Sequence, residues 1–505
     1  LLLLLSKQFE LFGQTMEFYT IFLFLIIFLC WKPLRKRSNY PPGCDGMPFL
    51  GCLPLLGVHP ANTIMKWSKR YGDVFYVKYA MQNVIMLNSF ESIKEALVKQ
   101  GHVFSGRQHT FITEFTSGNA GLGFLDYGAV WRSQRRFGLA TLHEFGMGRR
   151  CMAPKILEEA DLMCDEMLKH GDHAFDCMDH ITPAVTNIIS ILVFGKRFEY
   201  DDPTLLDTLH LLFDFGHDFP FGWGKVDILY LCTFRFLPPW KAELEKIRQA
   251  RKPVWDHIMS AIQQHQDTYN ENDCRDFIDS FIEAMVEDPN DNDVPAAWWN
   301  KEQLFHYVKE LFLAGTDTTA TTLRWAILLI HYHTDVHEKI HEEIDREASN
   351  PVKFEDMPNM PYTQAVIQEV FRSRPIANFG TMRKTTAVGK VGGYRIPKGS
   401  IVMPNIWAVH HNPQRWKNPH LFKPDRHIDQ NGKFVKSEDI IPFNVGQRSC
   451  LGMQLAKMEI FIFLVRMMQR FNFKLATDKE KLDLNGQYIF LHYPPAFDVS
   501  VQLRS

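Results

Sequence analysis

The sequence has little net charge and no paired cysteine motif. The first argues against a nucleic-acid-binding protein, and the second against a secreted protein held by disulfides. Its formal net charge is −2 over 505 residues, which gives no argument for binding a nucleic acid. Its nine cysteines are odd in number and include no CxxC pair. This usage favours a reduced, cytosol-facing protein over a secreted disulfide framework.

The chain also lacks a linker-like run of Gly, Ser or Pro, and it contains no internal repeat. Length alone suggests about three domains, but no segment marks a boundary between them. Hydrophobic residues make up 46% of the chain and charged residues 23%, proportions typical of a globular protein with a large core. We therefore expect a single large domain that is mainly α with a small β portion (α+β).

A charge-free apolar run lies near the N-terminus. Residues 18–31 read FYTIFLFLIIFLCW, which is short for a spanning helix and close to the core of a signal peptide. No small-residue cleavage site follows it, whereas four cations do: Lys32, Arg35, Lys36 and Arg37. Because flanking cations hold that end in the cytosol, residues 16–37 are expected to be a retained signal-anchor helix with a basic stop. A cleaved signal peptide is the alternative.

The segments on either side of this run divide the rest of the chain. Residues 1–15 stand before Met16 and are expected to be a non-native extension. Residues 38–51 include Pro41, Pro42 and Pro48, which stiffen the chain, so we expect a proline-rich hinge there. Residues 52–505 would then form the functional domain.

The stretch from Phe443 to Gly452 (FNVGQRSCLG) precedes an apolar helix pattern over residues 453–471. A cysteine at a helix N-terminus lies among unpaired N–H groups at the positive end of the helix dipole, and both favour a thiolate. Gly446 and Gly452 suggest that a planar or bulky group lies against the backbone beside the sulfur, and Arg448 would meet an anion. A thiolate-ligated haem with carboxylate side chains has these requirements; a buried structural cysteine is the simpler alternative.

This stretch resembles the haem-binding loop of the cytochrome P-450 (P450) family, with Cys450 as the axial ligand of the haem iron. The resemblance covers residues 40–505 and is closest to the microsomal family 2 type. It implies the P450 fold, haem b as the cofactor, and O2 and NADPH-derived electrons as cosubstrates. The loop residues that it assigns to haem binding besides Cys450 are Phe443, Gly446, Arg448 and Gly452.

The resemblance also implies a ring of cations for the haem propionates. Trp131 and Arg135 are four residues apart and share one helix face, a spacing that means little alone. In the family this pair and a preceding arginine meet the propionates, and Arg107 matches that arginine. Arg383 falls where relatives place a further propionate-binding Arg or His. Arginine suits a carboxylate because its planar fork pairs bidentately and stays charged.

A long buried helix is predicted over residues 304–333, with an unusual centre, Ala314-Gly315-Thr316-Asp317-Thr318-Thr319. Threonine side chains back-bond to helix carbonyls, so a local opening of the helix is expected here. An acid and an alcohol at such an opening can deliver protons to bound dioxygen, which assigns this job to Asp317 and Thr318. A threonine-rich packed helix is the alternative. The segment matches the family's oxygen-activation motif, including the small Ala314 beside the haem.

Four further interpretations rest on the same resemblance. Glu369, Arg372 and Arg426 resemble the buried Glu-Arg-Arg network that supports the cysteine loop, a structural role. The segment between Arg372 and Arg383 lacks the prolines that family 2 relatives usually carry. Because this segment lines the substrate pocket in the family, the difference weakens any inference about the substrate. The apolar residues 205–240 are interpreted as an access lid at the membrane, with ordinary core as the alternative. Pocket candidates are Phe124, Leu125, Ala314, Thr318, Ile376, Ala377 and Phe490.

A rival motif is His337-Glu338-Lys339-Ile340-His341, which satisfies HExxH. Both histidines fall on one helix face, and Glu338 would be the general base of a zinc metallopeptidase. However, the run HEKIHEEIDRE also reads as a charged, solvent-facing helix, and no distinctive third-ligand signature follows.

The resemblance implies an NADPH-dependent monooxygenase that hydroxylates or epoxidises a lipophilic substrate. Implied partners are NADPH-cytochrome P-450 reductase and cytochrome b5, and the implied location is the endoplasmic reticulum membrane with the catalytic domain in the cytoplasm. Arg132 and Arg136 would contribute to a basic docking surface, or form a solvated helix face. A haem-thiolate isomerase or dehydratase that needs no reductase is the alternative, although such relatives often lack the acid–alcohol pair present here as Asp317 and Thr318.

Overall fold

The computed structural model describes residues 40–504 apart from residues 49, 81, 110–112, 116–117, 119, 207–208, 210–237, 287–295 and 489–490. The expected extension and signal-anchor, most of the apolar segment 205–240 and Phe490 therefore lie outside the described residues. Within the described ranges, no helix is both long and apolar enough to cross a lipid bilayer.

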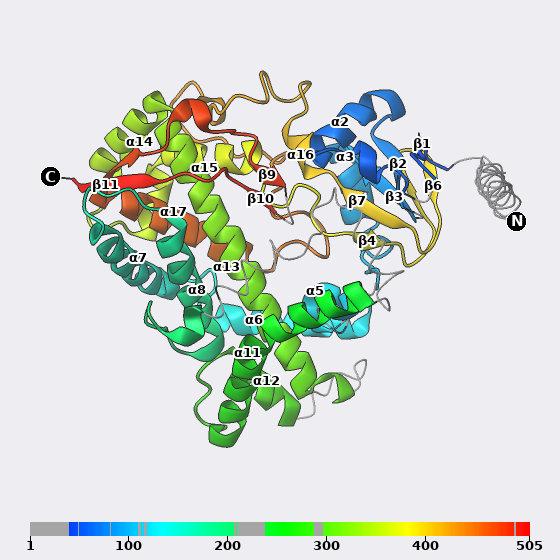
Figure 1. Cartoon of the computed structure of the whole chain (residues 1–505), viewed down its shortest axis with the longest axis horizontal. Helices are drawn as coiled ribbons and strands as arrows, with labels where there is room; N and C mark the ends of the chain where they lie inside the picture. The colour runs from blue at the N-terminus through cyan, green and yellow to red at the C-terminus, as the bar shows by residue number, and fades with distance from the viewer. Residues whose placement is uncertain are drawn as a thin grey trace, which may run out of the picture.

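Helices make up most of the described chain and surround one long central helix, α13 (Figure 1). The α-helices are α2 (Pro60–Tyr71), α3 (Phe90–Lys94), α5 (Gly121–Phe124), α6 (Ala129–Glu144), α7 (Ala153–Leu168), α8 (Met178–Phe194), α11 (Pro238–Thr268), α12 (Phe277–Val286), α13 (Lys301–Tyr332), α14 (Thr334–Glu347), α15 (Pro361–Ser373), α16 (Ile406–His410) and α17 (Met453–Arg470). Shorter helical segments are η1 (Leu53–Leu55), η2 (Glu95–Lys99), η3 (Arg150–Met152), η4 (Ala296–Trp298), η5 (Phe354–Asn359), η6 (Pro424–His427) and η7 (Lys479–Lys481).

One five-stranded sheet lies to the side of the helical body, beside α2 and α3 (Figure 1). Its strand order is β1 (Gly43–Cys44), β2 (Val74–Tyr79), β3 (Gln82–Leu87), β7 (Ile401–Pro404) and β4 (Arg383–Lys384). The pairs β1–β2 and β3–β7 are parallel, and β2–β3 and β7–β4 are antiparallel. Two-stranded sheets pair β5 (Gly389–Val391) with β6 (Tyr394–Ile396), β8 (Phe471–Leu475) with β11 (Val499–Leu503), and β9 (Gln487–Tyr488) with β10 (His492–Tyr493). The main sheet thus begins at Gly43, within the segment expected to be a hinge.

Both faces of the main sheet are covered. Along β3, Ile85 and Leu87 belong to one apolar cluster, and Val84 and Met86 belong to another on the opposite face. This alternation follows the two-residue period of a strand. The first cluster includes residues of α3 and η2, and the second includes residues of α2, so the sheet is a packed layer between helices.

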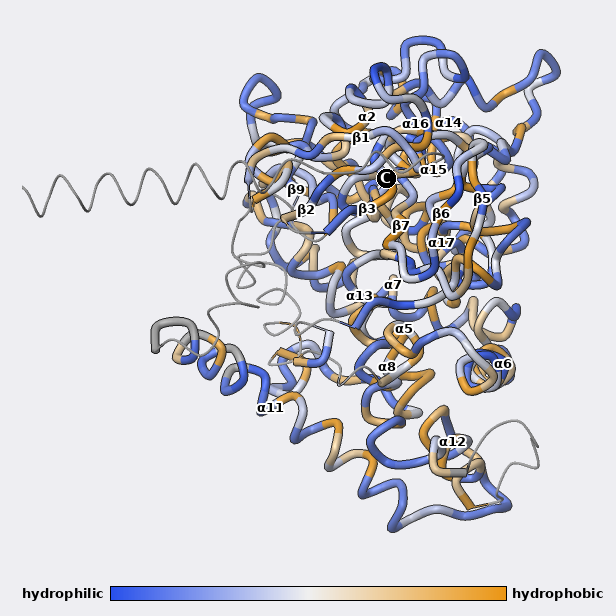
Figure 2. Tube along the Cα trace, turned by 90° about the vertical axis from the view of Figure 1, so that its right-hand side faces the viewer, coloured by the Kyte–Doolittle hydropathy of each residue, from blue (hydrophilic) through white to orange (hydrophobic). Residues whose placement is uncertain are grey.

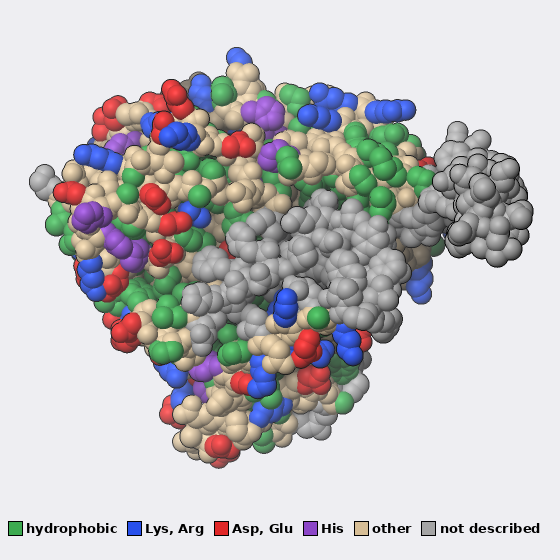
Figure 3. All heavy atoms as spheres, in the orientation of Figure 1, with side chains coloured by type: hydrophobic (Ala, Val, Ile, Leu, Met, Phe, Trp, Pro, Cys, Tyr) green, Lys and Arg blue, Asp and Glu red, His purple; other side chains and the backbone are tan. Residues whose placement is uncertain are grey.

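The helical body has its own large core, in which α13 packs against α8, α17, α5 and α15. Hydrophobic segments gather inside this body, and hydrophilic segments lie on its outside (Figure 2). On the face shown in Figure 3, acidic and basic side chains are interspersed, in keeping with the net charge of −2. The prediction of a mainly α domain with a small β portion is confirmed.

The predicted helix over residues 304–333 is present as α13, with one expectation about it overturned. The structure shows α13 as an uninterrupted α-helix from Lys301 to Tyr332, so the expected local opening at its centre is wrong. The threonine hydroxyls do bond to carbonyls four residues earlier, as Thr318 does to Ala314 and Thr322 to Thr318, each at 2.7 Å. These bonds are accommodated without breaking the helix, because the carbonyl oxygen has a second lone pair.

Candidate active site

The loop that carries Cys450 is closed by its own backbone. The N–H of Cys450 donates to the carbonyl of Phe443 at 2.9 Å, and the N–H of Ser449 donates to the carbonyl of Gly446 at 3.1 Å. Gly452 is the N-cap of α17, and its N–H donates to the sulfur. Burial raises the pKa of the Cys450 thiol, whereas the Gly452 N–H and the charge of Arg135 lower it. The sulfur therefore lies where a cation or a metal can hold it as a thiolate.

Gly446 and Gly452 are glycines in the cysteine loop for different physical reasons. Gly446 has a φ of +82°, and a Cβ there would lie 1.9 Å from the carbonyl oxygen of Leu97 in η2. The contact with η2 therefore requires this glycine, a cause that the sequence interpretation did not foresee. A Cβ at Gly452 would meet no protein atom within 4 Å, so there is room for a planar group beside the backbone on that side.

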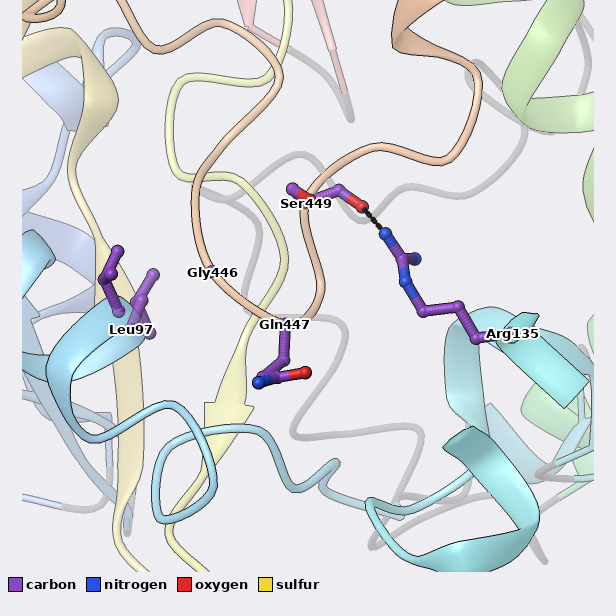
Figure 4. A pocket seen from close by; sticks show the side chains of 6 residues that line it. Leu97, Arg135, Gly446, Gln447 and Ser449 are labelled. Atoms are coloured by element: carbon purple, nitrogen blue, oxygen red, sulfur yellow. Dashed lines mark hydrogen bonds between the residues drawn. The ribbon is translucent and has the colours of Figure 1, made fainter. Parts of the chain in front are cut away.

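Four arginines from distant parts of the chain meet around Trp131 and the cysteine loop. Arg135 reaches from α6 to the carbonyl of Ser449 at 2.7 Å (Figure 4). The guanidinium of Arg448 lies 4.3 Å from the centre of the Trp131 ring, and that of Arg135 lies 5.6 Å from it. Arg107 and Arg383 both donate to the hydroxyl of Thr381, at 3.0 and 2.9 Å. We call Arg107, Arg135, Arg383 and Arg448 the arginine cluster.

The arginine cluster is rich in uncompensated positive charge. Among the described residues, none of its four guanidinium groups forms an ion pair with a carboxylate; carbonyl and hydroxyl oxygens accept their hydrogen bonds. Burial and then the charges of the other three arginines lower the pKa of Arg383 well below its usual range. Asp126 and Glu310 moderate the charge of Arg107 from beyond ion-pair distance.

The donor chemistry of this region fits haem b. The arginine cluster supplies several cationic forks for two carboxylates, which are the charged groups of that cofactor. Cys450 supplies a sulfur ligand beside it, and the backbone at Gly452 leaves space. Trp131 is 2% exposed, and its ring supports Arg448 and Arg135 while its Nε1–H donates to the carbonyl of Leu122 at 3.1 Å.

A hollow of about 340 Å³ borders the cysteine loop (Figure 4). It lies between η2 and α6, so it opens beside the loop rather than on α13. Its lining residues are Leu97, Val98, Arg135, Gly446, Gln447 and Ser449.

The centre of α13 presents a small residue and polar groups together. Ala314 is exposed although it lies in the middle of a long helix whose flanking turns are largely buried. The Thr319 hydroxyl donates to Glu459 of α17 at 3.3 Å, which joins this part of α13 to the helix that follows Cys450. Burial raises the pKa of Glu459 to about 8. The structure thus packs the 314–319 segment against α17, the helix that follows the cysteine loop.

Asp317 is held on both of its carboxylate oxygens. Oδ1 accepts a hydrogen bond from the Thr321 hydroxyl at 3.1 Å, and Oδ2 accepts one from the Tyr493 hydroxyl at 2.7 Å. The Thr321 contact follows from the i, i+4 spacing of a helix. Tyr493 lies 176 residues further along the chain, and no sequence signal indicated it.

The structure contains the predicted network of Glu369, Arg372 and Arg426, and it adds His427 as a fourth member. Arg372 donates to both oxygens of Glu369, at 2.8 and 2.7 Å, and Arg426 donates at 3.0 Å. His427, which the sequence interpretation missed although it follows Arg426 directly, lies 2.9 Å from Glu369. Burial alone would raise the pKa of Glu369, but the hydrogen bonds of Arg372 and His427 and the charges of Arg372 and Arg426 lower it to about 2.

The expected pocket residues fall into two places. Leu125 is 4% exposed and its carbonyl accepts from Arg448 at 2.6 Å, so it lies against the arginine cluster. Phe124 ends the short helix α5, and Ile376 and Ala377 are half-buried in the segment after α15. The Ile376 carbonyl accepts from the N–H of His492 at 2.9 Å, which places this segment beside β10.

The HExxH histidines lie on α14 as expected, with ring centres 4.4 Å apart for His337 and His341, and Glu338 is exposed. Within the described residues, a different group has three potential metal ligands close enough to share one ion, and it includes neither histidine: His265, Asp276 and Asp279.

Comparison with known proteins agrees with this geometry. The cytochrome P450 family model matches residues 41–501. Cytochrome P450 2U1 of Homo sapiens is 33% identical over 95% of this chain and 92% of that relative. Cytochrome P450 2A4 of Mus musculus is 33% identical over 95% of this chain and 97% of that relative. The chain belongs to the cytochrome P450 family.

Family membership gives this P450 its reaction class and its cofactor. It is a haem-thiolate monooxygenase, an oxidoreductase that uses haem b with O2 and NADPH-derived electrons and receives them from a redox partner of the reductase kind. The zinc-peptidase alternative is left without support, and the HExxH run is the charged helix α14 of a P450.

Proposed function

We propose that this P450 is a membrane-bound monooxygenase that inserts one oxygen atom from O2 into a lipophilic organic substrate, by hydroxylation or epoxidation. Its electrons come from NADPH through a flavoprotein reductase. The observation that carries the proposal is the arginine cluster around the cysteine loop, together with the packing of the α13 segment that carries Asp317 and Thr318 against α17, the helix after that loop.

The chain's own residues have defined roles in this proposal. Cys450 ligates the haem iron, the arginine cluster pairs with the propionates, and Phe443, Trp131, Gly446, Gly452 and Ala314 border the cofactor. When bound, the haem supplies reductive activation of O2 and the oxidation of the substrate. Glu369, Arg372 and Arg426 hold the segments around the loop and do not take part in chemistry.

Proton delivery is assigned to Thr318 and Asp317. Cleavage of O2 to water and one inserted oxygen atom consumes two protons, which a dry pocket cannot supply by itself. The Thr318 hydroxyl donates to the Ala314 carbonyl at 2.7 Å, so its oxygen lone pairs can accept a hydrogen bond from the direction of the pocket. Asp317, one residue earlier, would pass protons from solvent to this region.

The proposal also includes a redox partner and a membrane location. NADPH-cytochrome P-450 reductase, and cytochrome b5 as a second donor, would dock beside the hollow at the cysteine loop, where α6 presents exposed Arg132 and Arg136. Residues 16–37 would anchor the enzyme in the endoplasmic reticulum membrane, with residues 38–51 leading to a cytoplasmic catalytic domain.

The proposal is tested with the full chain in membranes together with a reductase. Reduced enzyme under CO is expected to absorb at about 450 nm. A fatty acid, a steroid and an alkoxycoumarin, incubated with NADPH, are expected to yield at least one oxygenated product with its new oxygen derived from ¹⁸O2. Product formation without NADPH and reductase would instead support the isomerase or dehydratase alternative.

Thr318→Ala is expected to uncouple NADPH use from product formation. Product per NADPH should fall by about tenfold, less than the ~10²–10⁴-fold effect of a lost general acid because water can take over part of the delivery. Hydrogen peroxide per NADPH should rise, and both ratios are measured on the best substrate of the panel.

The matched control for this prediction is Thr322→Ala. It removes a hydroxyl that bonds to the carbonyl of Thr318 in the same way, one turn further along α13, and it should leave coupling near the wild-type value. Equal coupling in Thr318→Ala and the wild type would remove Thr318 from the proton path.

A further inference from the structure

A hydrogen bond joins α13 to the hairpin of β9 and β10, which we call the C-terminal hairpin, at the proposed proton path. The Tyr493 hydroxyl donates to Asp317 Oδ2 at 2.7 Å, and Thr321 occupies Oδ1. An aspartate side chain without fixed partners can rotate about its Cα–Cβ bond among several staggered rotamers. Two donors on opposite oxygens restrict Asp317 to an orientation that suits both.

The strand that carries Tyr493 is itself fixed to α13. The indole N–H of Trp325, two turns after Asp317 on α13, donates to the carbonyl of His492 at 2.9 Å. Gly486 has a φ of +66°, and a Cβ there would lie 2.3 Å from the carbonyl oxygen of Tyr493 and 2.7 Å from the Trp325 ring. The hairpin of β9 and β10 is therefore pressed closely against α13, so the position of the Tyr493 hydroxyl is set by the fold.

The same hairpin touches the atypical segment between Arg372 and Arg383. The N–H of His492 donates to the carbonyl of Ile376 at 2.9 Å, and Ile376 is one of the expected pocket residues. One short strand thus contacts both the proposed acid, through Tyr493, and the proposed pocket wall, through His492.

Tyr493 is the donor in this contact while Asp317 carries its negative charge. Burial, followed by the charge of Asp317 and the hydrogen bond to it, raises the pKa of the Tyr493 phenol above its usual value. The hydroxyl keeps its proton throughout the physiological range and does not itself exchange protons with the carboxylate. Its effect on Asp317 is therefore one of orientation.

We propose that Tyr493 is a positioning residue for Asp317, which holds the carboxylate in the orientation from which protons reach Thr318. This inference rests on the proposed function, because it gives Asp317 its role in proton delivery. It adds a residue of the C-terminal hairpin to the determinants of coupling, and it links coupling to the strand that borders the pocket wall.

Tyr493→Phe tests this inference, since it removes one oxygen atom and keeps the ring. Product per NADPH is expected to fall by about fivefold, the size expected for one partly solvated hydrogen bond, and hydrogen peroxide per NADPH to rise. The ferrous-CO spectrum and the affinity for the panel substrate, taken from its optical titration, should stay within about twofold of wild type. Loss of the CO band would mean that Tyr493 serves folding, and would overturn the positioning role.

Tyr488→Phe is the matched control on the same hairpin. Tyr488 lies opposite His492 in the β9–β10 pair, and none of its described contacts is with Asp317. Its replacement should leave the coupling ratios unchanged. An equal loss of coupling in Tyr488→Phe would attribute the effect to the hairpin as a whole and overturn a specific role for Tyr493.

A double-mutant cycle separates this inference from the proposed function. Asp317→Asn alone should uncouple, and Asp317→Asn with Tyr493→Phe should be no worse than Asp317→Asn, because Tyr493 acts through the carboxylate. Coupled turnover in Asp317→Asn would refute the proton path itself. Uncoupling in Asp317→Asn with normal coupling in Tyr493→Phe, or additive losses in the double variant, would refute only the role of Tyr493.

Discussion

Cys450→Ser is expected to abolish the ferrous-CO absorption at about 450 nm and to lower monooxygenase turnover by roughly 10³-fold or more. A thiolate donates electron density to the iron that a serine hydroxyl at neutral pH does not, and this donation favours cleavage of the O–O bond. The loop itself should persist, because its closing bonds run between backbone groups of Phe443, Gly446, Ser449 and residue 450. Reduced CO difference spectra and product formation on the panel substrate measure the two effects.

Cys151→Ser is the control for this prediction. Cys151 is also a free cysteine, but it lies on η3, outside the cysteine loop. Its replacement should leave the spectrum and the turnover unchanged. A band at about 450 nm in Cys450→Ser would show that another residue ligates the iron.

Glu369→Gln is expected to lower the free energy of unfolding of the holoenzyme by about 3–5 kcal/mol. The side chain is fully buried and accepts from Arg372, Arg426, His427 and the N–H of Lys423. The amide cannot accept on its nitrogen, so buried cationic donors lose their partner. Urea unfolding followed by tryptophan fluorescence measures the change, and haem loss at the same urea concentrations reports whether the cysteine loop opens with it.

The contribution of Glu369 should also depend on pH in a defined direction. Its pKa is about 2 in the folded chain, against an ordinary value of 4.5, so the folded state binds the proton less readily than the unfolded state. The stabilisation is therefore complete above about pH 4.5 and declines as the pH falls toward 2. The difference between the wild type and Glu369→Gln should shrink over this range.

Glu342→Gln supplies the comparison for both measurements. Glu342 is exposed on α14, and its replacement should change the stability by no more than about 0.5 kcal/mol at any pH. A loss below about 1 kcal/mol in Glu369→Gln would mean that the buried network contributes little to stability.

The sequence predicted best those features that depend on local spacing. The helix after Cys450 and the long helix through Asp317 appear as α17 and α13, because their apolar patterns extend over many turns. The pairing of Glu369 with Arg372 follows from their i, i+3 spacing on α15. Arg448 was predicted from its place in the cysteine loop, whereas Arg107, Arg135 and Arg383 came from the family resemblance, since no periodicity joins Arg107 to Arg383.

Features that depend on distant backbone contacts escaped prediction. Gly446 is a glycine because of the carbonyl of Leu97, which is almost 350 residues away in the sequence. The contact of Tyr493 with Asp317 likewise needs the hairpin to be docked on α13 before it exists. Gly446 was noticed as part of the loop motif, but nothing local indicated its contact with Leu97, and nothing local indicated Tyr493 at all. The opening expected in α13 is absent for a local reason, since the threonine hydroxyls bond to carbonyl oxygens that also keep their helix bonds.

The arginine cluster has a consequence for how this protein is made. Four guanidinium groups drawn from the segment before α5, from α6, from β4 and from the cysteine loop repel one another wherever these segments come together. In the proposed function the two carboxylates of haem would turn that repulsion into attraction, so binding of the cofactor would stabilise this region by mass action. We therefore expect the yield of folded enzyme in a cell to depend on the supply of haem.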